Sequence, residues 1–135
     1  CRRNNDSDRI IDTPTQRTPR MTLQELTRQV ADFSDERDWG QFHSPKNLAM
    51  ALSVEASEIV EHFQWKTEAD SAALDADTRG AVADEIADVL IYLVRLADRL
   101  GIDPLDASAN KLRKNAEKYP ADKSRGRSDK YTSYE

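Results

Sequence analysis

Residues 82–96 read VADEIADVLIYLVRL, and this stretch decides the fold. Its apolar residues recur three and four positions apart, which predicts a helix from about Thr78 that Gly101 ends. The apolar surface of this helix is wider than one stripe, so several of its sides should be buried. Three other helices of similar size cannot cover it within one chain. We therefore expect an interface between subunits here. The apolar positions are Val82, Ile86, Val89, Leu90, Ile91, Leu93, Val94 and Leu96.

Two acidic residues of this stretch, Glu85 and Asp88, lie three positions apart, and Glu55 and Glu58 form a second such pair. Residues three apart in a helix point within about 60° of each other, so each pair projects two carboxylates side by side. Both pairs lie inside an apolar pattern. Carboxylates aimed at an interior repel one another unless a cation neutralises them, and oxygen ligands suit magnesium. The alternative is a solvated acidic face, but two pairs on separate helices favour a metal site.

Cap residues predict three further helices. Thr22 and Glu25 have the spacing of a capping box, and Ser44 and Asp103 each precede a proline at a first helical position. Gly40 should end the first helix, while Pro120 should close the last. The expected helices span about 22–37, 45–65, 78–100 and 104–118, and a polar linker over 66–77 has room for a short helical turn. This pattern predicts an all-α, four-helix-bundle-like protomer that assembles through helix packing.

The composition narrows the class of protein. The chain has 135 residues, enough for one small domain, and only four glycines, which favours helices. A net charge of −5 disfavours a protein that coats nucleic acid. No apolar run is long enough to span a membrane. The single cysteine, Cys1, fits a reducing cytoplasm, and the lack of a glycine-rich P-loop excludes an ATPase or GTPase of that type.

The chain divides into three segments. Residues 1–20 are rich in Arg, Asn, Asp, Thr and Pro and have no hydrophobic segment, which predicts a disordered leader rather than a secretory signal. Residues 21–120 hold the patterned helical domain. Residues 121–135 form a charged tail without an apolar period, which we expect to be ordered only by partners or substrate.

Aromatic and histidine side chains flank the acid-bearing helix over 45–65. Trp39 and Trp65 stand at its two ends, where packing is the usual role of tryptophan but stacking on a flat ligand is also open to them. His43 lies just before the helix, as a capping or a functional residue. His62 follows Glu58 by one turn, yet a hard carboxylate site does not require a histidine, so packing or solvent exposure is the favoured interpretation.

Basic residues gather toward the end of the chain. A charged, solvated helix face is the alternative for most of them. However, acidic metal clusters that face basic groups suit phosphate chemistry, because the metal polarises phosphoryl oxygens while cations hold the remaining charge. The helix over 104–118 carries Lys111, Lys114, Asn115 and Lys118, and the tail carries Lys123, Arg125, Arg127 and Lys130.

The acidic pairs and their surroundings resemble a known family. The chain contains Glu-x-x-Glu, then 26 intervening residues, then Glu-x-x-Asp. This pattern is similar to the signature of the MazG-like, all-α nucleoside triphosphate pyrophosphatases. Four further blocks resemble the dCTP pyrophosphatase branch, and together they extend the resemblance over about 21–132. These blocks are Arg37-Asp38-Trp39 to Leu48, Glu55 to Lys66, Glu85 to Leu93, and Lys111 to Tyr131.

The resemblance implies a helical homotetramer, or at least a dimer, that uses Mg²⁺ to hydrolyse a deoxynucleoside triphosphate to the monophosphate and pyrophosphate. The substrate it implies is dCTP or a modified dCTP, in a role of nucleotide-pool house-cleaning. By the same resemblance, the metal ligands are Glu55, Glu58, Glu85 and Asp88, with Glu58 ahead of Glu55 as the base that activates water. The nucleoside pocket holds Trp39, His43, Trp65 and Tyr92, and the groups nearest the phosphates are Lys111, Asn115, Arg125 and Lys130.

Two alternatives stay open. The same fold could act on dUTP or a phosphoribosyl nucleotide, although paired tryptophans favour a pocket that reads a base. The second alternative is a non-catalytic helical module, in which acidic and basic residues form salt bridges between subunits. One position departs from the resembled branch, which carries a histidine nine residues before the first tryptophan; here that residue is Val30.

Overall fold

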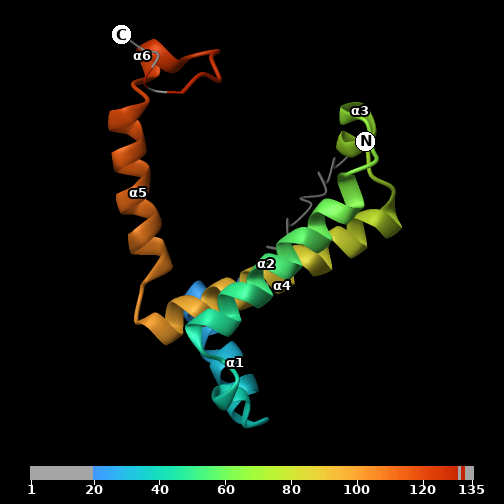
Figure 1. Cartoon of the computed structure of the whole chain (residues 1–135), viewed down its shortest axis with the longest axis vertical. Coiled ribbons are helices and arrows are strands. Elements are labelled where there is room, and N and C mark those ends of the chain that lie inside the picture. Colours follow the sequence, from blue (N-terminus) through green and yellow to red (C-terminus); the bar gives the residue numbers. More distant parts are fainter. Residues whose placement is uncertain (1–19, 131, 133–135) are drawn as a thin grey trace, which may run out of the picture.

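The computed structural model describes residues 20–130 and 132, and all regular structure in this range is helical (Figure 1). The all-α prediction is confirmed. The predicted leader lies outside the described residues, apart from Arg20. In chain order the elements are α1 (Leu23–Asp35), the 3₁₀ turn η1 (Trp39–Gln41), α2 (Pro45–Phe63), α3 (Glu68–Ala72), α4 (Ala76–Leu100), α5 (Pro104–Lys118) and α6 (Ala121–Ser124).

Helices α2 and α4 run antiparallel along each other, and α1 packs across α4 near its C-terminal end (Figure 1). The short α3 connects α2 to α4, where the sequence predicted a linker with a helical turn. Few of the described side chains are fully enclosed: the buried apolar ones are Leu48 of α2 and Val82, Val94 and Ala97 of α4. Helix α5 extends away from this group (Figure 1).

The helix ends follow the predicted caps. Thr22 and Glu25 form the complete capping box of α1, and Ser44 accepts a hydrogen bond from the backbone of Asn47 at the start of α2. Asp103 caps α5 by accepting from two backbone N–H groups, and Gly101 ends α4 with a left-handed φ of 65°. Each such side-chain cap stabilises its helix by about 1 kcal/mol.

The prediction that Gly40 ends the first helix is wrong. Helix α1 stops at Asp35, and Gly40 lies inside η1. The left-handed residue of this turn is Asp38, whose φ is 52°. Aspartate tolerates that conformation better than most residues. The turn sets Trp39 and His43 beside α1. At the other end of the chain, part of the charged tail forms the single helical turn α6.

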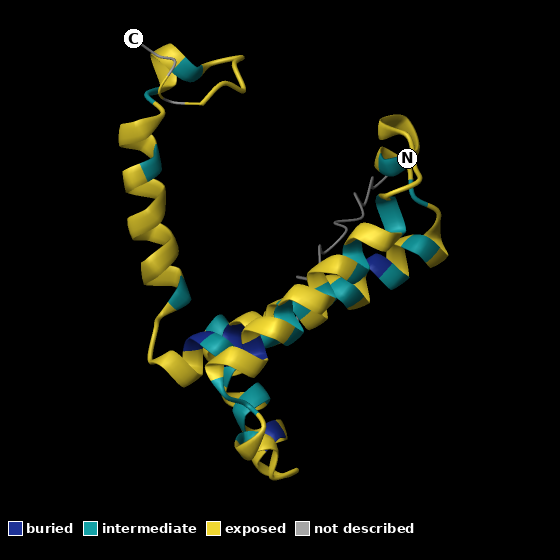
Figure 2. Cartoon of the chain, viewed as in Figure 1, coloured by how far each residue is buried: buried dark blue, intermediate teal, exposed yellow. Residues whose placement is uncertain are grey.

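Much of the surface of the long helices is exposed (Figure 2), and the exposed residues include large apolar side chains. On α4, Ile86 and Leu93 keep 54% and 43% of their surface accessible, and on α5 Leu112 keeps 68%. The excess apolar surface that the sequence predicted on α4 is therefore present within a single chain. None of the described helices is long and apolar enough to cross a membrane.

Candidate active site

Three carboxylates meet between α2 and α4. One oxygen from each of Glu55, Glu58 and Glu85 lies within 4.8 Å of the other two. The pairing of α2 with α4 brings them together, because each acid occupies the face of its helix that is turned to the other. A set of hard oxygen donors at this separation can hold a divalent cation such as Mg²⁺. Asp88, the fourth predicted ligand, is not in this group and follows Glu85 by one turn.

Two of the acids, Glu55 and Glu85, have raised pKa values. Removal from water, followed by the charges of Glu58, Asp88 and Glu85, raises the pKa of Glu55 above its usual value. Removal from water is likewise the first cause that raises the pKa of Glu85, and Glu58 is the second. A bound cation would relieve this repulsion, which is the physical reason that the donor set fits a metal ion.

His62 lies closer to the acids than the sequence argument allowed. Its Nε2 atom is 3.9 Å from Oε1 of Glu85, and its charge opposes the rise in the pKa of that carboxyl. The interpretation as a packing or exposed histidine is therefore incomplete. His62 forms an ion pair with one of the three clustered acids when it is protonated.

A cavity of about 390 Å³ lies between α1, η1 and α4 and has one of the predicted metal ligands, Asp88, in its wall. Three of the predicted pocket residues, Trp39, His43 and Tyr92, line it, and so does Asp88. Trp39 meets the His43 ring edge-on at 6.2 Å between ring centroids. Aromatic walls with a few polar groups suit a flat, partly polar ligand such as a base. Val30 also lines the cavity, so the departure from the resembled branch falls in its wall.

A buried polar cluster lies behind this wall, and no sequence pattern predicted it. The Arg95 side chain of α4 is buried and contacts Ser34 of α1 and His43. Nδ1 of His43 lies 3.1 Å from Oγ of Ser34 and 3.4 Å from Nε of Arg95. Burial, then the charges of Arg95 and Arg99, lowers the pKa of His43. The sequence signal was an arginine near the end of the apolar run 89–97, where a charged residue needs buried partners.

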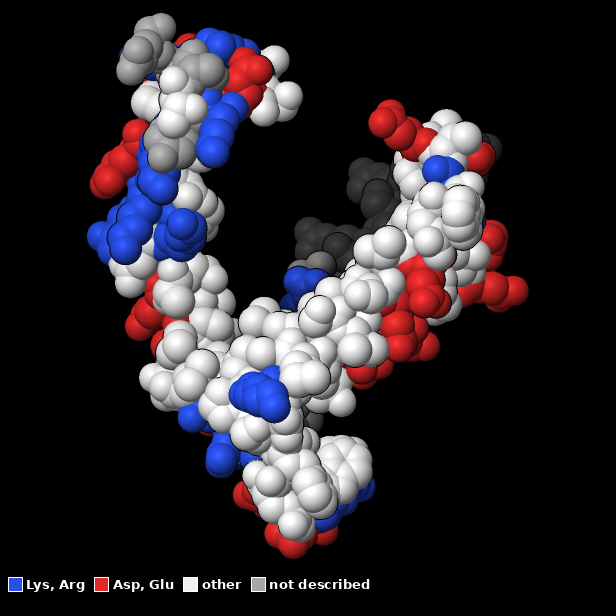
Figure 3. Space-filling view, in the orientation of Figure 1, with Lys and Arg blue, Asp and Glu red and all other residues white. Residues whose placement is uncertain are grey.

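The remaining predicted site residues lie elsewhere in this protomer. Trp65 follows the end of α2 and is 89% exposed. Lys111 and Asn115 lie on α5, and Arg125 and Lys130 lie in the tail. Figure 3 shows basic side chains along α5 and the tail, and acidic side chains on the arm formed by α2 and α4. The chain alone therefore does not bring the predicted phosphate-binding residues to the acids.

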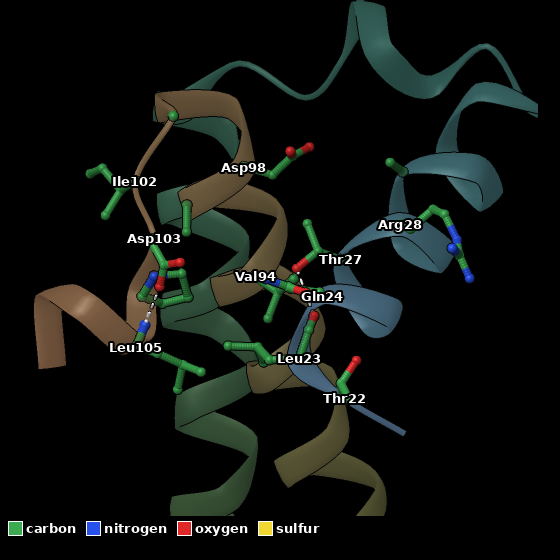
Figure 4. Close-up of a pocket in the computed structure, with 14 residues that line it drawn as sticks. Thr22, Leu23, Gln24, Thr27, Arg28, Val94, Asp98, Ile102, Asp103 and Leu105 are labelled. Carbon is green, nitrogen blue, oxygen red and sulfur yellow. Dashed lines mark hydrogen bonds between the residues drawn. The ribbon is translucent and has the colours of Figure 1, made fainter. Parts of the chain in front are cut away.

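A second cavity, of about 580 Å³, lies where the start of α1 faces the turn between α4 and α5 (Figure 4). Its lining is mixed: Leu23, Val94, Ile102 and Leu105 are apolar, whereas Thr27 and Asp98 are polar. It contains none of the residues predicted from the sequence to bind metal or substrate. The acids and the smaller cavity, rather than this groove, define the candidate active site.

Comparisons with known proteins address the family to which the chain belongs. A model of the MazG-like family matches residues 50–133. The chain is 41% identical to dCTP pyrophosphatase 1 of Rattus norvegicus over 134 residues, which cover 98% of this chain and 79% of that protein. It is 44% identical to dCTP pyrophosphatase 1 of Homo sapiens over 117 residues, which cover 85% of this chain and 69% of that protein.

A solved structure shares the fold as well. The crystal structure of a pyrophosphatase from Archaeoglobus fulgidus matches with a TM-score of 0.67 at 39% identity, covering 77% of this chain and 97% of that one. The acidic pairs, the all-α fold and these likenesses define a nucleoside triphosphate pyrophosphohydrolase. The chain belongs to the MazG-like family.

Proposed function

We propose that this enzyme uses Mg²⁺ to hydrolyse dCTP, or a modified dCTP, to the monophosphate and pyrophosphate in the cytoplasm. The observation that carries the proposal is that Asp88 links the aromatic cavity to the acidic cluster: it lines the cavity, and its charge raises the pKa of Glu55. A base in the cavity would leave its triphosphate within reach of the metal site. The name shared by the relatives from rat and human supports the choice of dCTP.

The residues divide the chemistry between them. Glu55, Glu58 and Glu85 would hold the ion, with Asp88 beside them, and the bound ion would neutralise charge on the triphosphate. Glu58 accepts a proton from the attacking water as the water oxygen bonds to the α-phosphorus. The bond from that phosphorus to the bridging oxygen breaks, and pyrophosphate leaves with the bonding electrons. No covalent intermediate with the protein is required.

We also propose that the working enzyme is a homo-oligomer, a tetramer or at least a dimer. Within one protomer, the predicted phosphate-binding residues lie on α5 and in the tail, and α5 extends away from the arm of α2 and α4 that carries the acids (Figure 1). Exposed apolar side chains on α4 and α5 provide surface for a second copy. Assembly would bury that surface, and it is the route by which Lys111, Asn115, Arg125 and Lys130 could reach a triphosphate bound at the acids of another protomer.

Substrate and metal can be tested together in one assay. We expect pyrophosphate release from dCTP with Mg²⁺, and no release after chelation and dialysis, because the acids repel the triphosphate without a cation. A panel should include modified dCTP, dUTP and the other deoxynucleotides, since Val30 lines the cavity wall. Preference for dUTP would replace dCTP as the substrate, whereas activity that persists without any divalent ion would contradict the metal site.

Assembly is tested by placing a charge on the exposed apolar surface of α5. We expect Leu112→Asp to dissociate the oligomer, because Leu112 is 68% exposed in the protomer and would be buried by a second copy. Asn110→Asp adds the same charge to the same helix at a polar position and should leave assembly intact. Light scattering at micromolar concentration measures both variants. A folded wild-type monomer under these conditions would remove the proposal.

A further inference from the structure

The guanidinium of Arg95 is held by three different partners. Only 6% of the Arg95 surface is accessible, and each of the three guanidinium nitrogens makes one hydrogen bond. Nη1 donates to Oδ2 of Asp98 at 2.8 Å, Nη2 donates to Oγ of Ser34 at 3.3 Å, and Nε donates to Nδ1 of His43 at 3.4 Å. A planar group fixed at three points cannot rotate, so Arg95 presents its Nε–H to His43 in one direction.

This arrangement determines where the imidazole proton lies. Arginine has only donors, so Nδ1 of His43 must offer its lone pair to Arg95. Oγ of Ser34 accepts from Arg95, which leaves its own hydroxyl hydrogen to donate to the same Nδ1 at 3.1 Å, so the two donors share the one lone pair of that nitrogen. With Nδ1 unprotonated, the single proton of a neutral imidazole lies on Nε2. The depressed pKa of His43 agrees with a neutral ring.

The opposite edge of the ring is available to a ligand. His43 lines the cavity beside Trp39, and no described residue provides a hydrogen-bond partner for its Nε2. No buried side-chain nitrogen or oxygen among the described residues lacks a partner, so this Nε2 is not sealed in the interior. Its N–H is therefore a donor directed to water or to whatever occupies the cavity.

We propose that Arg95 is a positioning residue that, together with Ser34, holds His43 as the neutral tautomer with its proton on Nε2, so that the cavity offers a fixed donor to the ligand. The ligand atom that meets it is then an acceptor, a carbonyl oxygen or an unprotonated ring nitrogen of a base. The inference rests on the proposed function only in taking the cavity as the base pocket. A donor fixed before binding orients the base without the cost of selecting a tautomer.

The tautomer can be measured without substrate or metal, so this result does not depend on the proposed reaction. The chain contains two histidines, and His62→Gln assigns the ¹⁵N resonances of His43 by elimination. At pH about 7.5, above the ordinary histidine pKa, we expect an unprotonated Nδ1 and a protonated Nε2. Arg95→Lys should give a mixture of tautomers, because one ammonium group cannot replace three directed contacts. A proton on Nδ1 in the wild type overturns the proposal.

Arg99→Gln is the matched control. Arg95 and Arg99 both lower the pKa of His43 through their charge, but only Arg95 is hydrogen-bonded to the ring. The control should keep the wild-type tautomer, which separates geometry from charge. If Arg99→Gln shifts the tautomer as far as Arg95→Lys does, the positioning role of Arg95 is wrong. Should Arg95→Lys not fold, Ser34→Ala removes one of the two donors to Nδ1 and is expected to give a smaller shift in the same direction.

Kinetics tests whether the ligand uses this donor. In His43→Gln the amide N–H can take the place of Nε2, whereas the shorter side chain of His43→Asn reaches only the place of Nδ1. We expect His43→Asn and Arg95→Lys to raise KM for dCTP about 2- to 10-fold, the effect of one hydrogen bond, with kcat little changed. His43→Gln should recover most of the wild-type KM. Equal KM values for the Asn and Gln variants would contradict a donor at Nε2.

Discussion

Replacing Glu58 by Gln is expected to lower turnover of the triphosphate at least about 100-fold while the protein stays folded. The variant loses a charged metal ligand and the base proposed to accept the proton from water. The amide keeps the size of the side chain, so the pairing of α2 with α4 should not change. Initial rates of pyrophosphate release at saturating Mg²⁺ measure the effect, and circular dichroism checks the fold.

The same variant should be at least as stable as the wild type when metal is absent. Glu58 lies with Glu55 and Glu85 in a cluster whose oxygens are within 4.8 Å of one another, and it raises the pKa of both neighbours. Removal of one negative charge relieves that repulsion, so the Tm of the metal-free protein should hold or rise. Mg²⁺ should then stabilise the wild type more than the variant, because only the wild type has the complete site.

Glu61→Gln is the control for both measurements. Glu61 is an exposed acid on the same helix, three residues beyond Glu58, and it is not among the three clustered acids. The two variants remove the same charge from the same helix. If Glu58→Gln keeps near-normal activity, or if Glu61→Gln is equally inactive, the assignment of the acidic cluster as the metal site is wrong.

Local signals predicted most of the fold. The capping box at Thr22, the Ser44-Pro45 start and the Gly101 stop depend on contacts within a few residues, so the sequence contains all the information they require. The end of α1 was missed for a related reason. The helix was predicted to end at Gly40 because glycine is the usual residue in the left-handed conformation. In the structure Asp38 adopts that conformation instead.

The acidic cluster was partly predictable, because part of it also depends on residues close together in the sequence. Helical spacing places Glu55 beside Glu58 on one helix, and the apolar pattern turns both toward the interior. Which acid of α4 completes the group depends on the register of α2 against α4, and helical periodicity does not determine that register. In the structure an oxygen of Glu85 lies within 4.8 Å of oxygens of Glu55 and Glu58, whereas Asp88 lines the cavity.

Contacts between segments that are distant in the chain could not be predicted from the sequence. Arg95 and Ser34 are 61 residues apart and meet only because α1 crosses α4. The direction of α5 is another such property. Periodicity predicts that the helix exists, yet the structure shows that it extends away from the acids and carries Lys111 and Asn115 with it (Figure 1).

The two tryptophans should affect substrate binding more than chemistry. We expect Trp39→Ala and Trp65→Ala each to raise KM for dCTP about 5- to 150-fold, because stacking of a base on an aromatic side chain contributes about 1–3 kcal/mol. The reaction at the α-phosphorus depends on the metal site and water, so kcat should fall less than in Glu58→Gln. Steady-state kinetics over a range of dCTP concentrations separates the two parameters.

The two tryptophans differ in whether they need a second protomer to contact the base. Trp39 lines the cavity of its own protomer, whereas Trp65 is 89% exposed and can reach a base only if assembly brings it to a cavity. Leu112→Asp, if it yields monomers, should therefore abolish the contribution of Trp65 and retain that of Trp39. Phe42→Ala is the control, since Phe42 is 59% exposed and does not line the cavity.

If both tryptophan variants bind dCTP as the wild type does but lose their oligomeric state, the tryptophans are packing residues. The base must then be read by other groups of the cavity wall, with His43 and Tyr92 the next candidates.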